Sequence, residues 1–422
     1  MCSSVFVPAT AYLEDEYNAS RELVTLTTSL YVAGLGAGPF VFAPISELYG
    51  RHRSYVLSMI GFTAINLGCC FADSLPGLIV LRFFFGFFGS SGPGLGVATI
   101  SDLFVPQERG RPIAVYAIGP MLGPVIGSLV GNYLVLLDWR WPFRVMTILI
   151  GLNTLAIVLC MEETYSSVLE RKFRAELGGA SEPSTGYAKE VFVRTFTRPP
   201  RMLLNPVCAL FATYYAYIYG IIYVFLVSLP LLFGRHDPPT GIYSYNWPAE
   251  TVGLCYLGLG VGFFASALTA AMYQDRIYRY MSIRHRNDGQ PEYRLIVTQL
   301  GMVIFPAGLL LWGWTAEAQV HWIVPLIGTA VFGYGLMAAF NSIQAFIVDA
   351  YAPYSAAAMA AATFMRSITG AVLPIFAPNL FLNLSYGKGA TLLACVSLPA
   401  VPVPVLLLMS GGRLREKWKF KA

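Results

Sequence analysis

Charge is scarce in this 422-residue chain, since only 12% of its residues are Asp, Glu, Lys or Arg. Soluble domains carry about 25% charged residues, so the composition excludes an ordinary soluble protein. Instead, 56% of the residues are hydrophobic, and apolar runs of about 20 residues, each long enough to cross a bilayer, recur along the sequence. The runs are continuous rather than alternating, which excludes a β-barrel. We therefore predict an all-α polytopic membrane protein.

Chemistry-bearing clusters are also lacking. The seven cysteines lie in or beside apolar segments without CxxC spacing, so they are expected to be small core residues rather than disulfides or metal ligands. The sequence shows neither a cluster of His, Cys and Asp residues nor a nucleophile–base pair that would indicate catalysis. We expect neither an enzyme nor a cofactor or metal ion.

Eleven apolar stretches are predicted to span the membrane. They are Glu22–Phe42, Tyr55–Ala72, Gly77–Ala98, Ile113–Val135, Pro142–Met161, Leu204–Leu232, Val252–Met272, Leu295–Trp314, Ile323–Val348, Ala356–Leu382 and Ala390–Met409. Cys2–Leu13 precedes them and is too short to span, so the first helix is expected to be truncated in this chain. The predicted parts are an N-terminal transmembrane half (1–161), a cytoplasmic central loop (162–201), a C-terminal transmembrane half (202–411) and a basic cytoplasmic tail (412–422).

The orientation follows from the basic residues. Most of the 28 Lys and Arg residues fall on the side of the loop that contains Gly50, so that side is predicted to be cytoplasmic. Five fall outside: Arg21, Arg140, Arg144, Arg235 and Lys388. The Asn-x-Ser sequons at Asn18 and Asn383 then lie outside as candidate glycosylation sites. The basic tail suits anionic lipid headgroups and requires no nucleic acid partner.

An internal repeat links the two halves. Asp102-x-x-x-Pro106 matches Asp349-x-x-x-Pro353 at a shift of 247 residues, and the match continues without gaps on both sides. Two homologous halves with a binding site between them are typical of secondary transporters.

Several motifs in order carry a family resemblance. They are FAPISELYGRHR (42–53), Arg82-x-x-x-Gly86, Gly119-x-x-x-Gly123-Pro124-x-x-Gly127-Ser128, Pro291-Glu292-Tyr293-Arg294-Leu295 and Val348-Asp349-Ala350-Tyr351. The chain resembles the major facilitator superfamily, in particular the fungal branch of the twelve-spanner drug:proton antiporters. The resemblance implies two six-helix halves around a substrate path. Departures from the pattern are Ala43 and Ser128 for glycines, Phe85 for glutamine, and the shortened first helix.

The first motif predicts a cytoplasmic gate. Gly50 allows a positive φ or a close approach in a tight turn. Glu47 and Asp102 are expected to pair with Arg51, Arg109 or Arg111, and Asp349 is the repeat counterpart of Asp102. Such pairs bias a rocking carrier if they form in only one state. In the alternative, the cations of this loop only fix the topology.

Arg82 lies inside a predicted span, where a charge costs several kcal/mol unless it is partnered. The resemblance implies a role in proton coupling, and snorkelling to the headgroups is the alternative. Further candidates for a substrate cavity are Tyr215, Tyr219, Tyr223, Asn341, Gln344 and Arg366. The three tyrosines share a helix face that suits a flat aromatic molecule, although tyrosines also form interfacial belts.

The third motif predicts helix packing. Gly119, Gly123 and Gly127 share one helix face, which lets another helix approach, and Pro124 bends the helix. The resemblance implies that this interface prevents leak in an antiporter.

No Asp or Glu lies in the middle of an intact span. Drug:proton antiporters that carry cations use such an acid, so neutral or weakly acidic substrates are favoured. We expect proton-driven export of a small amphipathic molecule by a monomer in the plasma membrane, with the vacuolar membrane as the alternative. The partners are then the substrate, protons and membrane lipids. Two other hypotheses are a nutrient uptake carrier or facilitator, and a truncated relic that does not transport.

Overall fold

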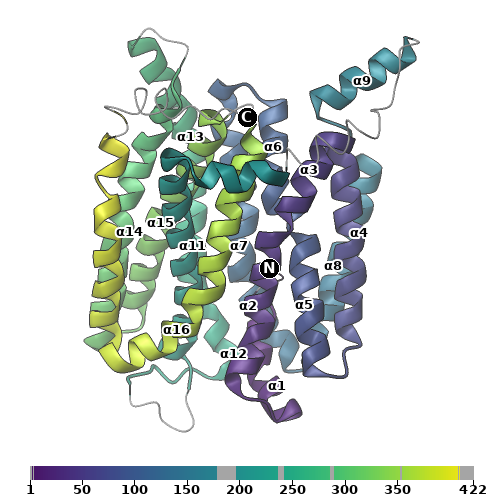
Figure 1. The fold of residues 1–422 in the computed structure, drawn as a ribbon. Coiled ribbons are helices and arrows are strands. Elements are labelled where there is room, and N and C mark those ends of the chain that lie inside the picture. Colours follow the sequence, from purple (N-terminus) through teal and green to yellow (C-terminus); the bar gives the residue numbers. More distant parts are fainter. Residues whose placement is uncertain are drawn as a thin grey trace.

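The computed structural model describes residues 2, 4–177, 196–235, 242–285, 289–351, 354–406 and 408. Within these residues the chain forms a bundle of long helices that lie side by side (Figure 1). The predicted basic tail 412–422, and residues 178–195 of the predicted central loop, lie outside the described residues.

The helices follow the apolar runs closely. The first part of the chain forms α1 (Thr10–Tyr17), α2 (Arg21–Ala37), α3 (Pro39–Tyr49), α4 (Arg51–Cys70), α5 (Leu75–Gly89), α6 (Ser91–Leu103), α7 (Gly110–Val135), α8 (Trp141–Cys160) and α9 (Ser166–Glu176). After a helical segment at residues 196–203, the second part forms α11 (Pro206–Phe233), α12 (Ala249–Val252), α13 (Tyr256–Arg284), α14 (Leu295–Glu317), α15 (Ile323–Ala350) and α16 (Ser355–Ser397). Short 3₁₀ turns are η1 (Val7–Ala9), η2 (Pro106–Glu108), η3 (Gly253–Cys255), η4 (Pro291–Arg294) and η6 (Leu398–Ala400).

Nine helical stretches of the described chain are long and apolar enough to cross a membrane. Two further predicted spans are also helical. α4 is less apolar because it begins with three basic residues, and it packs against α5 and α8. α16 holds two helices, because the chain turns at Ser385 with φ 63° and ψ 171° (Figure 1). Each of the eleven predicted spans therefore falls on helix, the last one in part, and the all-α membrane fold is confirmed.

Two spans are broken where the sequence analysis assumed continuous helices. The first breaks between α2 and α3, where Pro39 lacks the backbone donor that would continue the ladder. The second breaks at Ser90, between α5 and α6. The two breaks pack together, since a Cβ on Gly38 would overlap with the Ser90 side chain.

Close backbone contact joins α2 to α5. A Cβ on Gly34 would overlap with the carbonyl oxygen of Phe83, and a Cβ on Gly86 would overlap with that of Tyr31. Small residues commonly permit such approach between helices in membranes. The contact fixes Tyr31 against the helix that carries Arg82.

We call α1 to α9 the first half of the chain and α11 to α16 the second half. They contact each other along a seam, which is formed by α7 against α13 and by α2 against α16. At α2 and α16, Ser29 Oγ donates a 3.2 Å hydrogen bond to the carbonyl of Ala371. We call the end of the bundle with Gly50 and α9 the Gly50 end; α1 lies at the opposite end (Figure 1).

Candidate functional site

Gly50 forms the turn between α3 and α4, with φ 98°. A larger residue would be strained by this φ, and its Cβ would overlap with the carboxylate of Glu163. That carboxylate accepts hydrogen bonds from the backbone N–H groups of Arg51 (2.8 Å) and His52 (3.2 Å). It therefore occupies the N-terminus of α4, where the helix dipole favours negative charge. The predicted tight turn at Gly50 is confirmed.

Arg51 is the buried cation of this turn, with a side chain that is 3% exposed. Its Nε lies 2.9 Å from Oδ2 of Asp102, and its Nη1 donates a 2.6 Å hydrogen bond to Ser46. The guanidinium also lies 4.7 Å from the ring centroid of Tyr165. Burial raises the pKa of Tyr165, so the phenol next to the Arg51 guanidinium stays neutral. This ion pair lies within the first half and does not cross the seam.

The second half contains an equivalent pair that is linked to the seam. Arg294 Nε lies 3.1 Å from Oδ2 of Asp349, the repeat counterpart of Asp102. The other oxygen of Asp349 is 3.1 Å from Nη1 of Arg109, which belongs to the first half. Asp349 is 3% exposed, so it binds two arginines in a nearly dry site across the seam.

Asp275 makes a second contact across the seam. Its Oδ1 lies 2.9 Å from Nη1 of Arg294 and accepts a 2.9 Å hydrogen bond from the backbone N–H of Gly110. Its Oδ2 accepts a 2.8 Å hydrogen bond from the backbone N–H of Arg111. A carboxylate of the second half thus caps the N-terminus of α7 in the first. We call Arg109, Arg294, Asp275 and Asp349 the seam network.

Glu47 has an ion-pair partner that the sequence analysis did not name. Its Oε2 lies 3.3 Å from Nη1 of Arg198, in the helical segment 196–203. The Arg198 guanidinium lies 4.8 Å from the ring centroid of Tyr354, in the second half. The end of the connector therefore links α3 to the start of α16.

Arg82 lies on α5 and is fully buried. Its Nη1 donates a 3.4 Å hydrogen bond to the carbonyl of Cys2, while Nε and Nη2 have no partner among the described residues. Rings surround the guanidinium carbon, at centroid distances of 4.6 Å (Phe6), 5.0 Å (Tyr31), 5.5 Å (Phe143) and 5.8 Å (Phe85). The side chain does not reach the surface in this conformation, and cation–π contacts replace an ion pair.

Arg366 is a buried cation of the second half, on α16, with 4% exposure. Its Nη1 donates a 3.4 Å hydrogen bond to the Tyr215 hydroxyl, and its guanidinium lies 4.6 Å from the Tyr219 ring centroid. The Tyr219 and Tyr223 hydroxyls are 3.4 Å apart. The predicted tyrosine face of α11 and Arg366 are therefore brought together.

Asn341 and Gln344 lie buried on α15, one helical turn apart. Both amide atoms of Asn341 and Oε1 of Gln344 lack a hydrogen-bond partner in the described part of the chain. Phe340, next to Asn341, stacks on Tyr215 with centroids 4.4 Å apart. This stacking brings Phe340 of α15 into the Arg366 cluster.

Tyr31 connects the surroundings of the two arginines. Its ring contacts Arg82, and its hydroxyl lies within electrostatic range of Tyr219, which contacts Arg366. A series of neighbouring side chains therefore crosses the seam from α5 through α2 to α11 and α16. Its members are, in order, Arg82, Tyr31, Tyr219 and Arg366.

The predicted packing role of Gly119 is wrong. A Cβ on Gly119 would have no atom within 4 Å, so no helix approaches there. Glycines of α13 supply the contact instead: a Cβ on Gly260 would lie 3.0 Å from Val125 of α7. Gly123, Pro124 and Gly127 lie on the same helix α7, and Pro124 lies inside it. Their proposed role as an antiporter motif stays a prediction.

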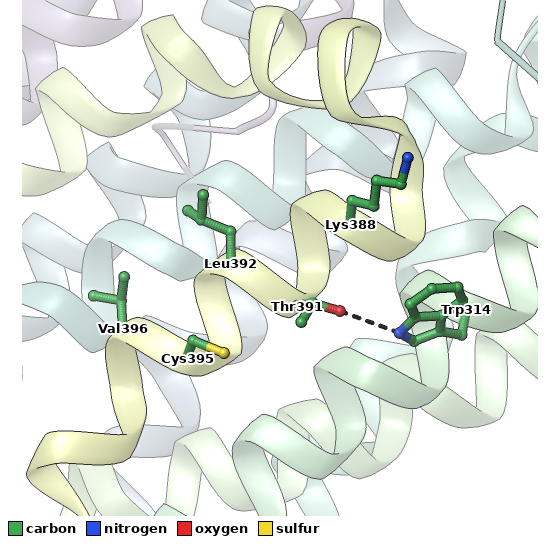
Figure 2. Close-up of a pocket in the computed structure, with 6 residues that line it drawn as sticks. All are labelled: Trp314, Lys388, Thr391, Leu392, Cys395 and Val396. Atoms are coloured by element: carbon green, nitrogen blue, oxygen red, sulfur yellow. Dashed lines mark hydrogen bonds between the residues drawn. The ribbon is translucent and has the colours of Figure 1, made fainter.

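The groove and the sequons on the surface lie away from the buried arginines. A groove of about 530 Å³ is lined by Trp314 of α14 and by Lys388, Thr391, Leu392, Cys395 and Val396 of α16 (Figure 2). It is mostly apolar, and Trp314 Nε1 donates a 3.1 Å hydrogen bond to Thr391 across it. Neither buried arginine lines this groove. Asn18 and Asn383 are exposed, and their glycosylation stays a prediction.

Sequence reasoning missed Asp275, Arg294 and Arg198. Arg294 lay within a quoted motif, but no role was inferred from it. Asp275 and Arg198 lie in charged stretches next to apolar spans, where charges are commonly explained by topology alone. Their partners are distant in sequence, so only the folded structure reveals them.

Two helical halves, a seam that crosses the bundle and charges buried along it define a membrane transporter. The family model described as "Major Facilitator Superfamily" matches residues 1–374, and the chain belongs to this superfamily. Its members are transporters rather than enzymes.

Curated relatives support the same assignment. The chain is 36% identical over 430 residues to the MFS-type transporter penM of Penicillium rubens, covering 99% of this chain and 83% of penM. It is 37% identical over 431 residues to the MFS-type transporter tndD of Aspergillus flavipes (99% and 79% covered). It is 33% identical over 433 residues to the efflux pump radE of Floropilus chiversii (100% and 79% covered).

Solved structures share the fold. The proton:xylose symporter XylE, bound to 6-bromo-6-deoxy-D-glucose, has a TM-score of 0.69 at 13% identity, covering 97% of this chain and 92% of XylE. The human organic anion transporter MFSD10 has a TM-score of 0.61 at 15% identity (95% and 88% covered).

Proposed function

We propose that the chain is a proton-coupled exporter of a small amphipathic molecule, such as a fungal secondary metabolite, toxin or drug, and that it works by alternating access. The fungal relatives named as transporters and as an efflux pump support export. The antiporter motif supports exchange against protons, and we propose that the proton gradient is the energy source and that no cofactor is needed.

The observation that carries this proposal is the seam network. Arg109 and Asp349 join the two halves at 3.1 Å, and Asp275 binds the α7 backbone across the same boundary. Contacts of this kind close one end of a carrier and must break when that end opens. A passive pore would need no such removable closure.

The residues have distinct proposed roles. Glu47, Gly50, Arg51, Asp102, Arg109 and Asp349 form the cytoplasmic gate, while Arg82 contributes to proton coupling. The proposed substrate path is lined by Tyr215, Tyr219, Tyr223, Asn341, Gln344 and Arg366. In this proposal the Gly50 end faces the cytoplasm, residues 1–161 and 202–411 are the moving halves, and residues 162–201 link them.

The proposed setting is the plasma membrane, with the chain as a monomer. The test of orientation is an epitope tag inserted in the central loop, probed in intact and permeabilised cells. We expect antibody binding only after permeabilisation; binding to intact cells would invert the topology. Loss of a glycosidase-sensitive size shift in Asn18→Gln and Asn383→Gln would identify the modified sequons.

Transport is tested with inside-out membrane vesicles and N-phenyl-1-naphthylamine, a neutral fluorescent amphiphile. An imposed gradient, acidic inside the vesicle, should drive accumulation of the probe, and a protonophore should abolish it. Vesicles without the protein are the control. Accumulation that is independent of the gradient would identify a facilitator instead, and gradient-driven loss of probe would identify an uptake carrier.

A further inference from the structure

Arg366 is a buried charge without a counter-charge in the described structure. Its interactions are the 3.4 Å hydrogen bond to Tyr215 and the contacts with the rings of Tyr215 (5.6 Å) and Tyr219 (4.6 Å). No acidic side chain among the described residues pairs with it, and its Nε has no partner there. A buried cation that is only partly satisfied is unfavourable, so the site gains most from an added anion.

Further polar atoms near Arg366 also lack partners. Thr363 lies three residues before Arg366 on α16 and therefore on the same face, and its buried hydroxyl is unpaired among the described residues. On the neighbouring helix α15, Asn341 is fully buried, and both of its amide atoms are unpaired among the described residues. Native proteins rarely leave such groups unsatisfied, which indicates that a ligand or water completes them.

The walls of this cluster are aromatic. Tyr215 and Phe340 stack at 4.4 Å, and Tyr219 lies 5.1 Å from Tyr223 between ring centroids. Tyr116 of α7 lies within electrostatic range of Arg366, which brings the first half to the same place. A planar guanidinium recognises planar anions through paired hydrogen bonds, and aromatic side chains accommodate flat apolar molecules.

We infer that Arg366, supported by Tyr215, is the seat for an anionic group, such as a carboxylate, enolate, phenolate or sulfonate, on an aromatic substrate. This inference rests on the proposed transport function and specifies its substrate class. The anion supplies the missing counter-charge of Arg366, and the rings of α11 and α15 hold the rest of the molecule. A cationic substrate would face Arg366 without a described carboxylate to offset the repulsion.

The test is equilibrium binding of matched fluorescent probes to the full purified chain in lipid nanodiscs. 8-Anilinonaphthalene-1-sulfonate and N-phenyl-1-naphthylamine share one aromatic skeleton and differ in the sulfonate. 1-Pyrenebutyric acid and 1-pyrenebutanol form a second pair. We expect saturable binding that is at least about tenfold tighter for the anion of at least one pair, as a charge-assisted hydrogen bond provides.

Variants then assign the preference to one residue. Arg366→Gln should remove the preference for the anion, and its melting temperature, compared with that of the native chain, shows whether the variant folds. Arg366→Lys should retain part of the preference, because Lys keeps the charge but lacks the planar fork. Arg144→Gln is the matched control, because this arginine is 47% exposed and lies near the end of the bundle opposite the Gly50 end. It should change neither the affinity for the anionic probe nor that for the neutral probe.

Two results would overturn the seat: equal affinity for the anion and the neutral probe in both pairs with the native chain, or an unchanged preference in Arg366→Gln. The first result requires no variant, so a folding failure of Arg366→Gln cannot hide it. The transport test is therefore run with the neutral probe and, in parallel, with 8-anilinonaphthalene-1-sulfonate. Failed gradient-driven transport of both probes with intact anion binding would reject the proposed export, and normal transport without anion preference would reject only the seat.

Discussion

The guanidinium carbon of Arg366 lies 4.6 Å from the centroid of the Tyr219 ring. In the first half, Arg82 lies 5.0 Å from the ring of Tyr31. Each half thus holds a buried arginine against a tyrosine of a neighbouring helix, with no described carboxylate at either position. Arginine does not lose its proton in proteins. Any contribution of these residues to proton coupling must therefore act on the acidity of another group.

Replacing Arg82 tests that contribution. Arg82→Ala should abolish accumulation driven by a pH gradient, while the protein still reaches its membrane, because the permanent charge is lost. Arg82→Lys should recover only part, since an ammonium cannot fill the four-ring site as a flat guanidinium does. The readout is probe accumulation in vesicles with and without the gradient. Unchanged gradient-driven accumulation in Arg82→Ala would require withdrawal of the coupling role.

Removing the charge of Asp349 tests the seam network. Asp349→Asn leaves Arg109 and Arg294 without full compensation, and breaking a buried pair costs about 3–5 kcal/mol. The Gly50 end should then spend less time closed. Ser101 and Ser355 provide a reporter, since their hydroxyls lie 3.5 Å apart across the seam. A disulfide between cysteines placed there should form more slowly in Asp349→Asn.

The control for this test is Glu108→Gln. Glu108 also pairs across the seam, with Arg279 at 3.2 Å, but both side chains are more than half exposed. Surface pairs contribute about 0–1 kcal/mol, so cross-linking should change little. Equal rates of cross-linking in the native chain and Asp349→Asn would show that the network does not control closure.

Arg51→Ala should slow turnover more than it weakens substrate binding.

Gly50→Ala tests the turn. The positive φ and the Glu163 carboxylate both oppose a Cβ, so we expect a loss of about 1–3 kcal/mol in stability. Gly92→Ala is the matched control, because a Cβ there meets no atom within 4 Å. Thermal unfolding of the purified proteins compares them. A melting temperature for Gly50→Ala equal to that of Gly92→Ala would contradict the strained turn.

Two glycines separate tight packing from open space. Gly262→Ala should destabilise the chain by about 1–3 kcal/mol, since its Cβ would overlap with the Ala330 carbonyl of α15. Gly119→Ala should be neutral or stabilising by up to about 1 kcal/mol, because Ala favours helix and meets nothing there. Unfolding curves measure both. A strong loss of stability in Gly119→Ala would restore the packing role that the structure assigns to α13.

The sequence predicted the features that depend on local interactions and on hydropathy, namely the membrane spans and the turn at Gly50. α15 begins at Ile323 as predicted, because a long apolar run and its flanks mark a span. Gly50 was recognisable because charges and a glycine between two spans leave few options for the backbone. The break before Pro39 was not predicted, because the sequence analysis treated the apolar run as one continuous helix, and its packing against the break at Ser90 on another span appears only in the folded chain.

The sequence predicted which residues belong to the candidate site better than it predicted which of them contact one another. Buried charges such as Arg82 and Arg366 stand out in an apolar chain, and Tyr215, Tyr219 and Tyr223 repeat at helical spacing. The pairing of Arg109 with Asp349, and of Glu47 with Arg198, was not predictable because it depends on how distant helix ends meet. Sequence periodicity also misplaced the small-residue contact of α7, since a helix face alone does not identify its neighbour.

The contact of Asp275 with α7 has a consequence for how this protein tolerates mutation. Its acceptors are side-chain oxygens, whereas the donors are main-chain N–H groups of residues 110 and 111. At position 111 every amino acid except proline supplies such a donor, so most codon changes there leave the hydrogen bond available. Position 110 is restricted to glycine, because a Cβ there would overlap with the Asp275 carboxylate and with Arg294. The genetic vulnerability of this contact is therefore concentrated in two codons, one in each half.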